Sequence, residues 1–258
     1  MSCGSLNLPK TIIWPFCGDP VTIHLNTWMP HADCPWSGFA PATATFCESN
    51  LCSWIAQPSN TWSNLPFIIA GIMIVKASSK GSLLKVLGHS AWFLGLGSAM
   101  FHASATFIFE VWDLLAMYMI SGLMLSLNAA RYWGFSKARQ TVVPYLTMTV
   151  LALVLLVSFR EIGIVLFALQ ITAALTLEVL MHLRDDHVDF TFSKRFVGTF
   201  VAAFAIWNLD VHNIWCEPSN HILTGHAVWH LLNAVAIWYI YRFYEQFKLS
   251  GESIKRSI

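Results

Sequence analysis

Long apolar stretches, separated by short polar segments, make up most of the chain after residue 60. An α-helix needs about 20 apolar residues to cross the hydrocarbon core of a bilayer. Hydropathy read over windows of about 19 residues predicts seven such helices. Their expected ranges are roughly 62–78, 83–105, 109–128, 141–159, 162–182, 192–209 and 224–243. The pattern therefore predicts an all-α integral membrane protein folded as a seven-transmembrane helix bundle.

The composition supports a membrane environment. Of the 258 residues, 56% are hydrophobic and only 11% are charged, whereas a soluble domain carries about 25% charged residues. The net charge is +1, so the chain lacks the basic excess that nucleic-acid binding requires. We therefore expect the protein to lie among membrane lipids and not to bind nucleic acid.

The basic residues predict the orientation of the bundle. All but two of the 15 Lys and Arg residues fall in the loops and tail on one predicted side of the membrane, and Lys10 and Arg160 are the two that do not. Because loops rich in Lys and Arg stay in the cytoplasm, we expect the C-terminus to be cytoplasmic and the N-terminus to lie outside. An odd number of spans agrees with this orientation.

The cysteines all fall on the predicted outer side. They are Cys3, Cys17, Cys34, Cys47, Cys52 and Cys216. Disulfides persist in oxidising compartments, so this one-sided distribution favours disulfides over scattered free thiols. Six cysteines allow many pairings, and the spacing alone does not choose among them.

Three segments follow from these patterns. We expect an extracytoplasmic, cysteine-containing N-terminal cap over residues 1–60, tied down by disulfides. The transmembrane domain covers residues 61–243, and a short basic cytoplasmic tail covers residues 244–258.

A few polar residues occur inside the predicted spans. Ser98 and His102 are four residues apart in the second span, Asp113 lies early in the third, and His226 and His230 are four residues apart in the seventh. Ionisable groups inside a membrane are costly and usually mark a functional site. In the predicted topology all five lie near the outer ends of their helices, and spacing by four places two side chains on one helix face. We therefore expect them to converge in one layer.

Three histidines beside a carboxylate suit a catalytic zinc ion, which takes three protein ligands and keeps a fourth position for water. Other uses of the same residues stay open at this point. A single membrane histidine is more often an interhelical hydrogen-bonding residue, and a pair spaced by four also suits a bis-histidine haem or a proton-conducting protein. The agreement in depth of all three histidines with Asp113 favours the metal site.

The order Ser98-x3-His102, Asp113 and His226-x3-His230 resembles the signature of the CREST membrane hydrolases, and particularly of the alkaline ceramidases. Further stretches resemble conserved segments of that family. They are CESN at 47–50, SNTWSNL at 59–65, WNLDVHNIWCE at 207–217 and GHAVWH at 225–230. Together these stretches cover most of residues 45–243.

The resemblance implies a role for each residue. His102, His226 and His230 would hold zinc, Asp113 would deprotonate the attacking water, and Ser98 would hydrogen-bond the oxyanion. The substrate would be ceramide, hydrolysed at its N-acyl amide to sphingosine and a free fatty acid. The alternatives are a hydrolase of another N-acyl lipid and a non-catalytic seven-transmembrane receptor with a structural zinc, since the superfamily also has a receptor branch.

The resemblance also implies a disulfide and bears on calcium. The cysteines of CESN and NIWCE match a disulfide-forming pair of the family, so we expect a Cys47–Cys216 bridge. The family's animal members bind calcium through acidic residues of the first segment, and Glu48 and Asn50 match that pattern. Thr45 and Gln57, however, replace an expected Asp and an expected Glu. Because a hard cation needs carboxylates, we expect weak or no calcium binding.

Overall fold

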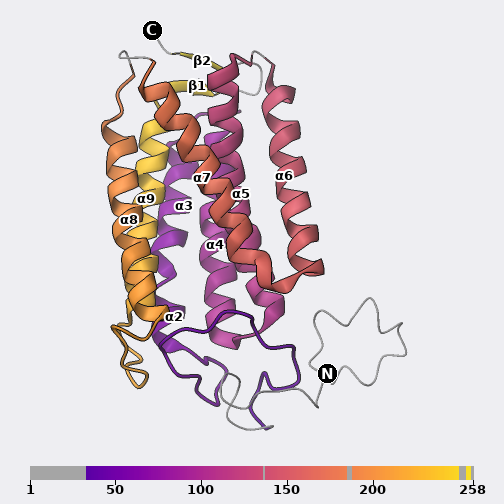
Figure 1. Cartoon of the computed structure of the whole chain (residues 1–258), viewed down its shortest axis with the longest axis vertical. Helices are drawn as coiled ribbons and strands as arrows, with labels where there is room; N and C mark the ends of the chain where they lie inside the picture. The colour runs from indigo at the N-terminus through magenta and orange to yellow at the C-terminus, as the bar shows by residue number, and fades with distance from the viewer. Residues whose placement is uncertain (1–32, 136, 185–187, 250–253, 257–258) are drawn as a thin grey trace, which may run out of the picture.

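A computed structural model of the chain describes residues 33–135, 137–184, 188–249 and 254–256. Seven long helices run along the long axis of the molecule (Figure 1). They are α3 (Leu65–Ala77), α4 (Leu84–Ser104), α5 (Phe107–Trp133), α6 (Ala138–Ser158), α7 (Gly163–His182), α8 (Thr191–Val211) and α9 (Gly225–Tyr244). The described chain also contains four shorter elements: the α-helix α2 (Pro58–Trp62), the 3₁₀-helix η3 (Arg160–Ile162) and the strands β1 (Phe247–Leu249) and β2 (Ile254–Arg256).

Each of the seven ranges expected from hydropathy coincides with one long helix to within a few residues. Three helical segments of the described chain are long and apolar enough to cross a membrane by themselves: Phe107–Trp133, Ala138–Ser158 and Arg160–His182. The other long helices carry more polar residues or, like α3, are shorter. The all-helical bundle and its compatibility with a membrane are therefore confirmed.

Helix α5 packs against α4, α6 and α7, and α9 packs against α3 and α8. The contact between α3 and α4 depends on glycine. A Cβ atom on Gly71 would lie 2.5 Å from the backbone nitrogen of Trp92, and one on Gly88 would lie 2.9 Å from the carbonyl oxygen of Gly71. The two backbones touch at these positions, which holds α4 in register against α3.

The turn between α4 and α5 is tight and is covered by the segment before α2. Helix α4 ends at Ser104. The next residue, Ala105, has a left-handed backbone with φ 52°, and α5 begins at Phe107. The last carbonyl groups of a helix lack partners within it. Here the backbone N–H groups of Ala56 and Gln57 donate to the carbonyl oxygens of Ala103 and His102, at 2.8 and 3.1 Å. The covering segment is thus joined directly to the last turn of α4.

Two disulfides hold this covering segment. Cys34 pairs with Cys52 inside the segment, and Cys47 pairs with Cys216 in the loop before α9. The second pairing is the one that the family resemblance implies. Cys3 and Cys17 lie outside the described residues.

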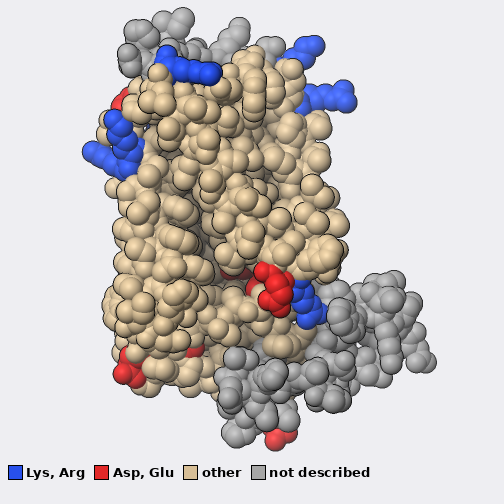
Figure 2. Space-filling view, viewed as in Figure 1, with Lys and Arg blue, Asp and Glu red and all other residues tan. Residues whose placement is uncertain are grey.

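The opposite end of the bundle carries the short antiparallel hairpin of β1 and β2 (Figure 1), which the sequence patterns did not predict within the expected tail. Beneath it, Arg131 of α5 forms a buried ion pair with Glu178 of α7, 2.8 Å between Nη1 and Oε2. The guanidinium also lies over the ring of Phe247, 4.0 Å from its centroid. Most Lys and Arg side chains visible in Figure 2 gather at this end, and the middle of that face is almost bare of charge.

Candidate metal and active site

Three buried histidines meet between α4 and α9. His102 lies in the last turn of α4, whereas His226 and His230 occupy the first two turns of α9. Their ring centroids lie 4.5 to 5.0 Å apart, and the exposed fractions of the three residues are 1%, 4% and 3%. The expected convergence of these side chains is therefore present in the structure.

The nitrogens of these rings are close enough to share an ion. The Nε2 atoms of His102 and His226 are 3.2 Å apart, and one ligand atom from each of the three rings falls within 4.8 Å of the others. Two nitrogens bound to one tetrahedral zinc at about 2.0–2.1 Å each lie about 3.3 Å from one another. The three histidines could hold a metal ion of this kind.

The remaining ring nitrogens have different environments. The Nδ1 atom of His102 lies 2.8 Å from Oε1 of Gln57, and that of His230 lies 2.8 Å from Oγ of Ser63. In contrast, Nδ1 of His226 is buried and has no hydrogen-bond partner among the described residues. Gln57 and Ser63 flank the short helix α2, and no charge or hydropathy signal in the sequence singles them out.

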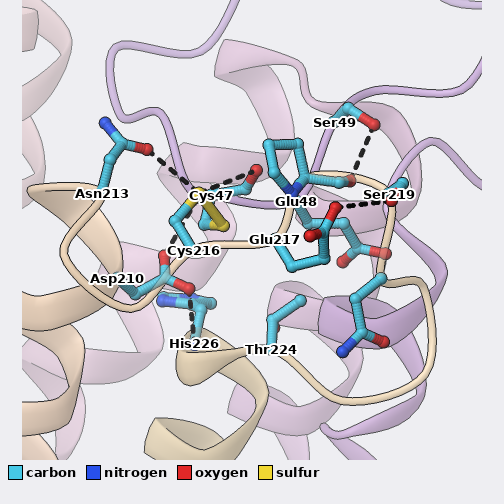
Figure 3. Close-up of a disulfide and its surroundings, with 12 residues drawn as sticks. Cys47, Glu48, Ser49, Asp210, Asn213, Cys216, Glu217, Ser219, Thr224 and His226 are labelled. Atoms are coloured by element: carbon cyan, nitrogen blue, oxygen red, sulfur yellow. Dashed lines mark hydrogen bonds between the residues drawn. A yellow bond between two sulfur atoms is a disulfide. The ribbon is translucent and has the colours of Figure 1, made fainter.

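Asp210 anchors the start of α9 to the covering segment. This fully buried carboxylate, at the end of α8, accepts hydrogen bonds from the backbone N–H groups of Cys47 and His226, both at 3.0 Å. Figure 3 shows Asp210 between the Cys47–Cys216 disulfide and His226. Sequence reasoning did not single out Asp210, although an acidic residue close to a cysteine of the same motif is a visible signal.

Ser98 and Asp113 line the same cavity as His226 and His230. Ser98 lies one turn before His102 on α4, and Asp113 lies on the facing side of α5. The structure thus brings all five residues expected at the site into one region.

The cavity has a volume of about 280 Å³ and is mostly apolar. It extends between α5, α7, α8 and α9, where its lining includes Met117, Ile171, Phe200, Trp207, Trp229 and Ile237. A second carboxylate, Glu110, also lines it. Glu110 accepts hydrogen bonds from the backbone N–H and the hydroxyl group of Thr43, at 2.7 and 2.6 Å, so it ties α5 to the covering segment.

Glu48 and Asn50, the two matches to the calcium pattern, have protein partners. The Glu48 carboxylate accepts from the backbone N–H groups of Ser59 and Asn60, both at 2.8 Å, and lies 2.9 Å from Nδ1 of His221. Oδ1 of Asn50 accepts from the Gln57 amide at 2.9 Å. Glu48 therefore forms local hydrogen bonds at the start of α2.

The fold and the site together define a helical protein with membrane-compatible helices and a buried cluster of histidines that could bind a metal beside an apolar cavity. Residues 39–257 match the model of the ceramidase family, and the chain belongs to that family. It is also similar to alkaline ceramidase YPC1 of Saccharomyces cerevisiae, with 24% identity over 240 residues that cover 78% of this chain and 75% of the yeast protein.

Family membership confirms the resemblance to the alkaline ceramidases and makes the protein an enzyme, a hydrolase acting on the amide bond of ceramide. A non-catalytic receptor is not favoured by this result.

Proposed function

We propose that the protein is a zinc-dependent intramembrane amidase that hydrolyses the N-acyl amide of ceramide to sphingosine and a free fatty acid. One observation carries this proposal: three buried histidines converge, and two of them, His226 and His230, line an apolar cavity together with Ser98 and Asp113 in a chain of the ceramidase family. Such a cavity suits an amide that carries two long hydrocarbon chains, because its apolar walls replace water around them.

In this proposal His102, His226 and His230 would hold a zinc ion. A zinc ion in such a site lowers the pKa of water and polarises a carbonyl group. Three buried imidazoles would supply a donor set of the catalytic type.

Asp113 acts as the general base that takes a proton from the attacking water. The water oxygen bonds to the amide carbon while the carbonyl oxygen accepts a hydrogen bond from the Ser98 hydroxyl. The C–N bond then breaks, and Asp113 returns the proton to the leaving nitrogen. The reaction consumes one water and releases the fatty acid and the amine.

We further propose that all seven long helices span the membrane, with the hairpin end in the cytoplasm and the histidines toward the extracytoplasmic side. The gathering of Lys and Arg at the hairpin end supports this orientation (Figure 2). The two disulfides at the other end support it as well. A protease-sensitive tag placed after Ile258 should be cleaved only from the cytoplasmic side of sealed membranes, and cleavage from the other side would reverse the orientation.

Calcium binding is expected to be weak or absent, because Thr45 and Gln57 remove two carboxylates from the pattern and the remaining one, Glu48, is hydrogen-bonded within the protein.

The experiment that tests the central proposal compares purified wild-type protein with His226→Ala and Asp113→Asn. We expect one zinc per chain in the wild type, loss of zinc in His226→Ala, and loss of ceramide hydrolysis in both variants. Zinc without turnover of ceramide would redirect the activity to another N-acyl lipid. Wild-type protein without zinc would contradict the metal-dependent mechanism.

A further inference from the structure

The segment that contains α2 contacts two of the three histidines from outside the cavity. Gln57 directly precedes α2 and Ser63 directly follows it, and both side chains are buried. Gln57 meets His102 on α4, and Ser63 meets His230 on α9. One short helix therefore touches two ligand residues that belong to different long helices.

The hydrogen-bond partners of Gln57 determine which way its amide group points. Its Nε2 atom faces the backbone carbonyl oxygen of Glu48 at 3.3 Å and Oδ1 of Asn50 at 2.9 Å. A carbonyl oxygen only accepts hydrogen bonds, so the NH₂ group must be on that side. Oε1 then faces Nδ1 of His102, and also accepts from Asn60 at 3.1 Å. Nδ1 of His102 must therefore carry the proton.

The hydrogen bonds of Ser63 indicate that Nδ1 of His230 is protonated as well. A serine hydroxyl has one proton to donate. We assign it to the carbonyl oxygen of Asn60, 3.0 Å away, because that oxygen can only accept, whereas Nδ1 of His230 can either accept or donate. The Ser63 oxygen, 2.8 Å from Nδ1 of His230, is left as an acceptor. Nδ1 of His230 is therefore also the protonated nitrogen.

Neutral imidazole carries one proton, so a proton on Nδ1 leaves the lone pair on Nε2. We infer that Gln57 and Ser63 are positioning residues that fix His102 and His230 in the tautomer that presents Nε2 to a metal ion. This inference deepens the proposed function, because it rests on the three histidines being zinc ligands. Partners of this kind orient the ring and raise the basicity of the ligand nitrogen.

The third histidine, His226, has no partner of this kind among the described residues. Nδ1 of His226 has no hydrogen-bond partner in the described part of the chain, and Asp210 holds only its backbone N–H. The tautomer of His226 is thus not set by a side chain. Metal affinity should consequently depend on Gln57 and Ser63 although neither residue touches the ion.

The test measures zinc affinity and does not use catalysis. The full chain is purified in detergent, stripped of metal, and titrated with Zn²⁺ against a chromophoric chelator. The variants are Gln57→Met, which keeps the length of the side chain but removes the acceptor, Gln57→Glu, which keeps an acceptor oxygen toward His102, and Ser63→Ala. Ser90→Ala is the matched control, since Ser90 is a buried serine of α4 whose hydroxyl bonds to the Val86 carbonyl oxygen.

We expect Gln57→Met and Ser63→Ala to weaken zinc binding about 10- to 100-fold, while Ser90→Ala stays close to the wild type. Gln57→Glu keeps the acceptor toward His102 but loses the donor toward Glu48 and Asn50, so it should bind zinc more tightly than Gln57→Met. The visible spectrum of the Co²⁺-loaded protein should change in Gln57→Met and Ser63→Ala and not in Ser90→Ala. Equal zinc affinity in the wild type, Gln57→Met and Ser63→Ala would overturn the inference, and so would an equal loss in Gln57→Glu and Gln57→Met. Wild-type protein that binds no zinc would instead reject the proposed function. If Gln57→Met fails to fold, Ser63→Ala decides alone.

Discussion

Two buried polar clusters lie toward opposite ends of the bundle and differ in how their hydrogen bonds are completed. At the hairpin end, Arg131, Glu178, Asn128 and Tyr244 bond to one another, and Asn128 also donates to the carbonyl oxygen of Ala174. At the other end, the Nε2 atoms of His102 and His226 lie 3.2 Å apart, one ligand atom from each of the three histidines falls within 4.8 Å of the others, and Nδ1 of His226 has no hydrogen-bond partner in the described residues.

The difference is between a cluster whose hydrogen bonds are complete and a cluster that could hold a metal ion. A cluster whose donors and acceptors are matched internally needs no ligand, and it joins α5, α7 and α9 as a fixed unit. Buried nitrogen lone pairs that face one another without a proton between them cost free energy. A metal ion bound by these lone pairs would remove that cost. Burial and polarity are similar in both clusters, so the completeness of the hydrogen bonding is the property that distinguishes them.

The largest expected effect is on catalysis at the histidine end. Asp113→Asn should lower the rate of ceramide hydrolysis about 10²- to 10⁴-fold, because an amide cannot act as the general base, while zinc content stays at the wild-type level. Glu110→Gln is the matched control, since Glu110 lines the same cavity but is bonded to Thr43. Equal rate losses in the two variants would show that the rate of hydrolysis depends on negative charge in the cavity and not on a general base at Asp113.

The next largest effect is a loss of stability at the hairpin end, where the Arg131–Glu178 ion pair is buried. Glu178→Gln leaves the Arg131 guanidinium buried without its counter-charge and should destabilise the protein by about 3–5 kcal/mol. Thermal unfolding in detergent measures this loss. The double variant Arg131→Met/Glu178→Leu should recover much of it, and zinc content per folded chain should be unchanged in both. A loss of zinc would show that the two clusters are coupled.

Removal of the disulfide beside the histidines should have an intermediate effect. Cys216→Ser should cost about 2–4 kcal/mol of stability and should also weaken zinc binding, because Asp210 bonds both Cys47 and His226. Cys34→Ser breaks the other bridge, which has no such link to α9, and should leave zinc affinity nearly unchanged. Chelator competition on the two variants side by side provides the measurement.

The smallest effect is a gain of function. Thr45→Asp combined with Gln57→Glu places two carboxylates near Glu48 and Asn50, and carboxylate count governs Ca²⁺ affinity. We expect weak calcium binding to appear, detectable by isothermal titration, where the wild type has little or none. A double variant that binds no more calcium than the wild type would show that the geometry of this segment, as well as its charge, excludes the ion.

Hydropathy located the seven long helices to within a few residues, because each must bury or expose a long apolar surface regardless of its neighbours. His102, His226 and His230 were also visible in the sequence, since ionisable side chains inside apolar stretches are rare. Gln57, Ser63 and Asp210 were not expected at the site. They are polar residues in loops or at helix ends, where such residues are common and carry no periodic signal.

The amino-acid sequence by itself determined which segments become helices, which residues could hold a metal, and which family the chain resembles. The tertiary structure alone decided which side chains support the histidines. Those contacts depend on how the segment around α2 folds over the ends of α4 and α9. Hydrogen bonds between residues 45 to 167 positions apart depend on distance and direction in space, and neither quantity is encoded in local residue patterns.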